Sequence, residues 1–148
     1  MLPLLRNLLA HCEWANGVFF HAWGKSPARD HEEMRRRLDH LVGVQQGFLA
    51  VFRGERPGGP PDGPPDSYDG LKARAQTCHA GLAVFAAGLT PDGLTRPVHI
   101  PWFGEPPLHI AVADALVQLC MHSQHHRGQC MTRLKDHGGE PKNVDYIV

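Results

Sequence analysis

Proline and glycine are distributed unevenly along this chain, and their positions limit the regular structure that it can form. Most of the 13 prolines lie in two stretches, residues 54–67 and 89–107. Proline has no backbone N–H to donate, and its ring clashes with the preceding helical turn, so neither stretch can be a helix. We expect residues 54–67 to form an exposed connection inside one domain of residues 1–148, because neither side is large enough to fold alone.

Four segments outside these stretches repeat apolar residues at the spacing of an amphipathic helix. They run from Leu2 to about Trp23, from about Arg29 to Arg53, from about Tyr68 to Ala87, and from about His109 to Asp136. Lengths of this order are typical of helical bundles. The sequence therefore predicts an all-α fold, a four-helix bundle with a long crossover between helices three and four.

Two of the predicted helices begin with a capping signal. Asp30 and Glu33 have the spacing of a capping box at the start of the second helix. Ser67 or Asp66 is a suitable N-cap for the third helix.

The crossover contains its own apolar residues. Val98, Ile100, Trp102 and Phe103 lie between its prolines. They favour a short extended piece, with a small hairpin around residues 103–105.

Composition excludes several classes of protein. Of the 148 residues, 15 are Lys or Arg and 15 are Asp or Glu, so the formal net charge is zero, which argues against a nucleic-acid partner. We see no secretory signal and no apolar run of about 20 residues, which argues against export and against membrane insertion. The cysteines form no CxxC pair, which favours free thiols in a cytoplasmic protein. They are Cys12, Cys78, Cys120 and Cys130.

Histidine is unusually frequent, with 11 residues in 148. Its imidazole is the commonest metal ligand in proteins, so the excess points to a metal site. His122 and His126 are four residues apart and therefore share one helical face, which continues the apolar line towards Cys130. His122 with His125 is the other possible pair, but His125 continues an outward line with Gln129. We prefer His122 and His126.

Two ligands hold a metal weakly, so a third should come from another helix. The candidates are His40 in helix two, His79 in helix three and His11 in helix one. Periodicity does not select among them, because His40 lies at the border of its helix's apolar stripe.

Three segments together resemble a known family. They are Trp14-Ala15-Asn16, Leu38-Asp39-His40-Leu41, and His122-Ser123-Gln124-His125-His126-Arg127-Gly128-Gln129, and the ending Asp145-Tyr146-Ile147 fits as well. The chain resembles the DinB-like (damage-inducible) superfamily of metal-binding bundles. That superfamily includes thiol-dependent S-transferases and mycothiol-dependent maleylpyruvate isomerases.

The resemblance implies that His40, His122 and His126 are the metal ligands, and that the protein is a homodimer. The chain departs from the family at two places. Many members carry an acidic residue where this chain has Gln45, and a tryptophan common near Phe48 is absent. These departures place any role for a carboxylate beside the metal in doubt.

Three imidazoles leave open positions on a metal, the arrangement of a reactive site. Such a metal activates water or binds a thiol as thiolate. The predicted function is a metal-dependent transferase or hydrolase that uses nickel or zinc, acts on a small molecule and draws on a low-molecular-weight thiol. His125 or Gln129 would orient ligands or handle protons, and Cys130 would belong to the core. The alternatives are a non-catalytic, metal-binding stress-response bundle and a purely structural bundle with incidental histidines.

Overall fold

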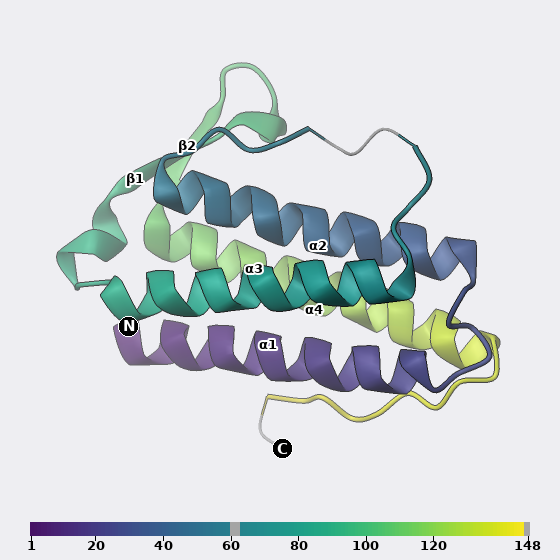
Figure 1. Ribbon diagram of the computed structural model, residues 1–148. Helices are drawn as coiled ribbons and strands as arrows, with labels where there is room; N and C mark the ends of the chain where they lie inside the picture. The colour runs from purple at the N-terminus through teal and green to yellow at the C-terminus, as the bar shows by residue number, and fades with distance from the viewer. Residues whose placement is uncertain (60–62, 147–148) are drawn as a thin grey trace.

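Four long helices run along a common direction in the computed structural model, which describes residues 1–59 and 63–146 (Figure 1). They are α1 (Leu2–Gly24), α2 (Glu32–Arg53), α3 (Tyr68–Gly88) and α4 (Val112–Asp136). The predicted all-α bundle is confirmed, with its crossover between α3 and α4. Ile147 and three residues of the proline-rich connection lie outside the described residues.

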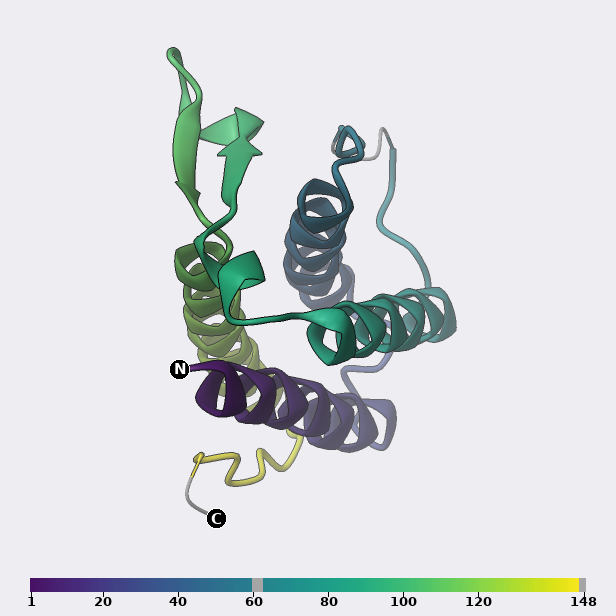
Figure 2. The ribbon, with the colours of Figure 1, turned by 90° about the vertical axis from the view of Figure 1, so that its left-hand side faces the viewer.

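The four helices occupy the corners of a square when the bundle is viewed along its length (Figure 2). α2 packs between α3 and α4, and α1 packs between the same two helices on the other side. Consecutive helices α1 and α2 therefore stand at opposite corners. Among the described residues, every helix is too short or too polar to span a lipid bilayer.

A small β-hairpin interrupts the crossover. β1 (Pro97–Ile100) pairs antiparallel with β2 (Leu108–Ala111), with His99 opposite His109. The prediction that helix four begins near His109 is therefore wrong. The backbone groups of His109 belong to the strand ladder, and α4 begins at Val112.

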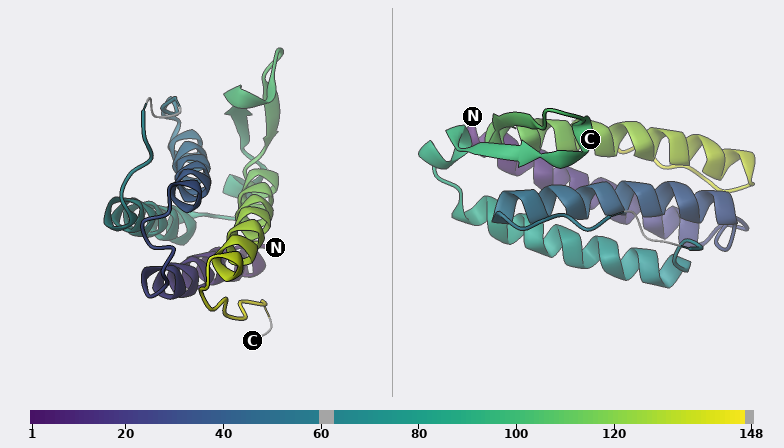
Figure 3. Two further views of the ribbon diagram at one scale, coloured as in Figure 1. Left: turned by 90° about the vertical axis from the view of Figure 1, so that its right-hand side faces the viewer. Right: turned by 90° about the horizontal axis from the view of Figure 1, so that it is seen from above.

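The hairpin also corrects the extent of the predicted extended piece. Val98 and Ile100 lie in β1, but Trp102 and Phe103 lie in a short 3-10 turn, Pro101–Phe103. Proline fixes its own φ near the helical value, which suits the first residue of such a turn. The Trp102 ring packs edge-on against Phe48 of α2, with the ring centroids 5.2 Å apart. The hairpin thus lies beside the start of α4 and contacts α2 (Figure 3).

One of the two predicted capping signals is confirmed. Ser67 accepts a hydrogen bond from the backbone N–H of Gly70 at the start of α3. The capping box of Asp30 and Glu33 is wrong, because the N-cap of α2 is His31 and makes no side-chain bond. Residues 26–31 form successive hydrogen-bonded turns before the helix, and the Glu33 side chain bonds forward along it instead.

The interior consists of two apolar clusters with a polar layer between them. One cluster surrounds Leu116 and Phe48, and the other surrounds Trp23 and Leu38. Cys130 belongs to the second cluster, as predicted, and all four cysteines are free thiols. The buried polar residues, which we call the polar layer, are Asn16, Gln45, His79, Ser123 and Arg127.

The segment after α4 folds back along α1 (Figure 1). The backbone carbonyl of buried Val144 accepts a hydrogen bond from the His11 ring at 2.9 Å. The Tyr146 ring packs on the same imidazole, with centroids 5.4 Å apart. His11 therefore anchors the returning chain.

Candidate metal centre

Three histidines meet where α2 and α4 face each other. His40 comes from α2, and His122 and His126 come from successive turns of α4. Each offers a ring nitrogen, and the three nitrogens lie within 4.8 Å of one another. Ring centroids are 4.2 Å apart for His122 and His126, and 4.7 Å apart for His40 and His126. A single metal ion between them would reach all three.

The geometry favours the predicted pair on α4 over its alternative. His122 and His126 are both partly buried and lie on one helical face. His125 is exposed, and its ring is hydrogen-bonded to the Gln129 amide at 2.9 Å. His125 therefore lies beside the group of three, with its ring centroid 5.1 Å from that of His126.

The structure also separates the three candidates for the third ligand. His79 is buried in the polar layer, where its Nε2 accepts a hydrogen bond from the Asn16 amide at 2.9 Å. His11 bonds to Val144 at the far side of α1. Only His40, among these candidates, lies beside His122 and His126. Its role as a ligand stays a prediction, because proximity alone does not establish metal binding.

The environment keeps the α4 imidazoles neutral, and a neutral imidazole is the form that binds a metal. Burial, together with smaller effects of the neighbouring histidines, lowers the pKa of His122 to about 4. Burial also lowers the pKa of His126, with His40 the next contributor. In addition, the buried Nδ1 of His122 has no hydrogen-bond partner among the described residues. The residues present therefore fit a divalent metal bound by nitrogen.

Gln45 lies in the polar layer, five residues after His40 on α2. Its side chain is fully buried, and its amide donates a hydrogen bond to the Ser123 hydroxyl at 2.9 Å. Its oxygen accepts a longer bond, 3.5 Å, from the Asn16 amide. An uncharged amide joins these neighbours without burying another charge. Position 45 therefore ties α2 to α1 and α4, and supplies no carboxylate.

Sequence reasoning missed the structural role of Arg127. Its side chain is only 2% exposed, and one of its terminal nitrogens donates to the Asn16 oxygen at 2.9 Å. The other terminal nitrogen donates to the Gln124 amide oxygen. Arginine is rarely buried, so periodicity alone would place it at the surface. The glutamine that interrupts the apolar stripe of α2 was the one sequence signal of a buried polar layer.

A second group of possible ligands lies at one end of the bundle. His31, Glu33 and His137 also place one ligand atom each within 4.8 Å of one another. However, the Glu33 carboxylate accepts hydrogen bonds from Arg37 and lies 3.3 Å from an Arg133 nitrogen. The bond from Arg37 is the largest of the effects that hold the pKa of Glu33 below its usual value. The carboxylate in this end cluster is already occupied.

Comparison with known families agrees with the geometry. The sequence profile of the DinB superfamily matches residues 20–130, well over half of the chain. The chain belongs to the DinB superfamily. The matched range includes all three histidines of the candidate centre. Among curated proteins, none matches this sequence. The family is thus established, and the activity of this DinB-superfamily member has to be argued from its own residues.

Proposed function

We propose that this DinB-superfamily protein is a metal-dependent transferase or hydrolase that holds one divalent ion, nickel or zinc, through His40, His122 and His126. The observation that carries the proposal is the approach of three ring nitrogens, within 4.8 Å, from two packed helices. Imidazole ligands suit both ions. The two α4 imidazoles are held by helical backbone at their positions, so the site is largely formed before an ion binds.

The arrangement leaves room for a reactant. When bound, a divalent ion with three imidazole ligands supplies a Lewis acid that lowers the pKa of a coordinated water or thiol. His40 is exposed, so the site opens to solvent on the α2 side. A small molecule, together with a low-molecular-weight thiol, can therefore approach from outside the bundle.

We assign the proton-handling role to His125. Its ring lies beside His126 at the rim of the site and remains in contact with solvent. The Gln129 amide bonds to the Nε2 atom of this ring and fixes its orientation. The Nε2 atom carries the basic lone pair of the neutral ring, so it would accept a proton from an incoming thiol or water after releasing the Gln129 amide, and would then pass the proton to bulk solvent. The resemblance to the family further supports a homodimer, and the free cysteines support a cytoplasmic location.

The alternative is a non-catalytic metal-binding bundle that acts in a stress response. The exposure of His40 favours it, because one of the three ligands lies at the surface. Both functions use the same ligands. They differ in whether the metal-loaded protein turns over a substrate.

Metal content and turnover test the proposal together. Tag-free protein should contain one nickel or zinc ion per chain, and His40→Ala and His126→Ala should lose it. His21→Ala, at an exposed position of α1, is the matched control and should keep the ion. The loaded wild type should then convert at least one substrate in a panel of thiol–electrophile pairs and esters, and His125→Ala should lower kcat without losing metal.

The results for metal content and turnover distinguish the enzyme from the two alternatives. Metal that binds without any turnover would support the non-catalytic alternative. Metal absent from the wild type after reloading would contradict both and leave the structural bundle.

A further inference from the structure

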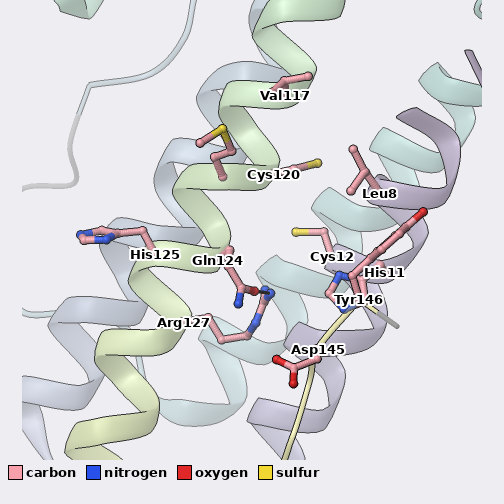
Figure 4. A pocket seen from close by; sticks show the side chains of 11 residues that line it. Leu8, His11, Cys12, Val117, Cys120, Gln124, His125, Arg127, Asp145 and Tyr146 are labelled. Carbon is pink, nitrogen blue, oxygen red and sulfur yellow. Dashed lines mark hydrogen bonds between the residues drawn. The ribbon is translucent and has the colours of Figure 1, made fainter. Parts of the chain in front are cut away.

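A cavity of about 470 Å³ lies between α1 and α4, on the side of α4 away from α2 (Figure 4). Cavities of this size are typical of small-molecule sites. No residue of α2 and none of the three candidate metal ligands lines it, and the two sites share only His125, which lies at the rim of the metal centre. Its walls come from α1, α4 and the returning C-terminal segment: Leu8, His11, Cys12, Val117, Cys120, Met121, Gln124, His125, Arg127, Asp145 and Tyr146.

The walls of this cavity are mainly apolar. Leu8 from α1 faces Val117 and Cys120 from α4 across the space (Figure 4). Burial raises the pKa of the Cys120 thiol to about 12, so it is an uncharged wall. The Tyr146 ring closes one side together with His11. Such a surface suits an aliphatic or aromatic group and gives a polar solute little to bind.

One permanent positive charge, that of Arg127, lies in this mainly apolar space. Figure 4 shows the Arg127 side chain extending from α4 towards α1, beside the Gln124 amide. Its two hydrogen-bond partners, Asn16 and Gln124, are both neutral amides. Its Nε is buried and has no hydrogen-bond partner among the described residues. None of the ion pairs found within that part of the chain includes Arg127.

A buried guanidinium without a counter-charge is costly, because arginine does not lose its proton in proteins. The cost is removed if an anion enters the adjoining cavity. A carboxylate matches the guanidinium fork in shape and accepts charge-assisted hydrogen bonds from it. The apolar walls would at the same time cover the rest of the ligand.

We propose that the cavity between α1 and α4 binds a small amphipathic carboxylate, with its charged end on Arg127 and its apolar body against Leu8, Val117 and Cys120. An aliphatic and an aromatic body share this chemistry. Asp145 lines the same cavity from the returning segment, and its charge selects against a second carboxylate on the ligand. The proposal does not rest on the proposed enzymatic function, since the metal ligands lie outside the cavity and the ligand contacts named here do not include His125.

Titration calorimetry on metal-free protein tests the proposal, because a carboxylate cannot then bind to a metal. Octanoate and 3-phenylpropanoate are the probes, and octan-1-ol and acetate are the controls that lack the charge or the body. One octanoate or 3-phenylpropanoate should bind per chain, at least ten times more tightly than octan-1-ol or acetate. Asp145→Asn should tighten the binding of octanoate a few-fold.

Two variants locate the site. Arg127→Met removes the charge at similar length and should weaken octanoate to the level of octan-1-ol. If this variant does not fold, Val117→Trp fills the cavity from a partly exposed helical position and should abolish binding without a change in Tm. The matched control is Val84→Trp, at an exposed position of α3 outside the cavity lining.

Three results would overturn the proposal. They are equal binding of octanoate and octan-1-ol, unchanged octanoate binding in folded Arg127→Met or Val117→Trp, and no binding of either carboxylate at millimolar concentration.

Discussion

The molecule contains two groups of three side chains that are equally close together and yet differ as metal sites. The candidate metal centre of His40, His122 and His126 lies along the lengths of α2 and α4. The end cluster of His31, Glu33 and His137 lies where α2 begins and α4 ends. In both groups the ligand atoms lie within 4.8 Å of one another.

The difference lies in what else the ligand atoms do. In the metal centre, burial keeps the α4 imidazoles neutral, and one buried nitrogen of His122 has no partner among the described residues. In the end cluster, two arginines hold the Glu33 carboxylate and add positive charge. A cation has to displace or approach those arginines. Distance alone therefore does not identify a metal site, and free lone pairs in a neutral setting are needed as well.

Removal of one ligand of the metal centre should have the largest effect on zinc affinity. His122→Ala should raise the Kd for zinc by about a hundredfold or more, since even supporting residues around a metal ligand change affinity by up to about that factor. His137→Ala, in the end cluster, should leave the Kd unchanged. Competition titration with a chromophoric chelator measures both. Equal losses in the two variants would show that the ion binds at the end cluster or is shared.

Metal loading should stabilise the fold through the same site. With free zinc at about 100 times its Kd, linkage predicts about 2.7 kcal/mol of added stability. For a chain of this size that corresponds to a rise in Tm of roughly 5–10 °C, measurable by circular dichroism. His40→Ala should show no rise, and His137→Ala should show the full rise. A zinc-dependent Tm in His40→Ala would contradict the three-ligand assignment.

His79 is a buried histidine that belongs to neither group, and its lowered pKa should make the stability of the protein depend on pH. Burial, followed by the charge of Arg127, lowers its pKa from 6.5 to about 4. Below pH 6.5 the unfolded chain therefore binds a proton that the folded chain refuses, and stability falls as the pH falls towards 4. The loss from this residue should be about 2 kcal/mol between pH 7.5 and 5.

Chemical denaturation of metal-free protein at the two pH values measures this dependence. His79→Gln should be less stable at pH 7.5 but should lose less stability on acidification. His21→Gln is a control at an exposed position. An unchanged pH dependence in folded His79→Gln would show that other groups carry it.

The smallest expected effect is on zinc affinity, when the end cluster is converted into a second metal site. Arg37→Gln combined with Arg133→Gln frees the Glu33 carboxylate and removes two positive charges. We expect the affinity for a second zinc ion to rise roughly five- to tenfold. Arg36→Gln is the control, because Arg36 pairs with Glu32 instead. Isothermal titration should show a second binding step in the double variant only, and its absence would mean that the geometry of the end cluster is unsuitable.

The sequence predicted the elements whose local signals agree, and missed those decided by distant contacts. The bounds of α1 and the Ser67 cap follow from local chemistry. The start of α4 did not, because pairing with β1 draws His109 into a strand. The choice of His40 required the resemblance, since periodicity placed it at a stripe border. The polar layer and the cavity beside Arg127 depend on which helices become neighbours and on the return of the chain along α1.

The polar layer also fixes the helices lengthwise. Apolar side chains tolerate a shift along their neighbours. Gln45, in contrast, forms its hydrogen bonds with Ser123 and Asn16 at only one position of α2 along the bundle axis. A slip of α2 by one turn, about 5.4 Å, would leave the buried Gln45 amide without these two partners. His40 lies on the same helix, little more than one turn from Gln45. The hydrogen bonds of Gln45 therefore also set the axial position of His40 relative to His122 and His126. Hydrogen bonds in the interior thereby keep the three candidate ligands at matching positions along the bundle axis.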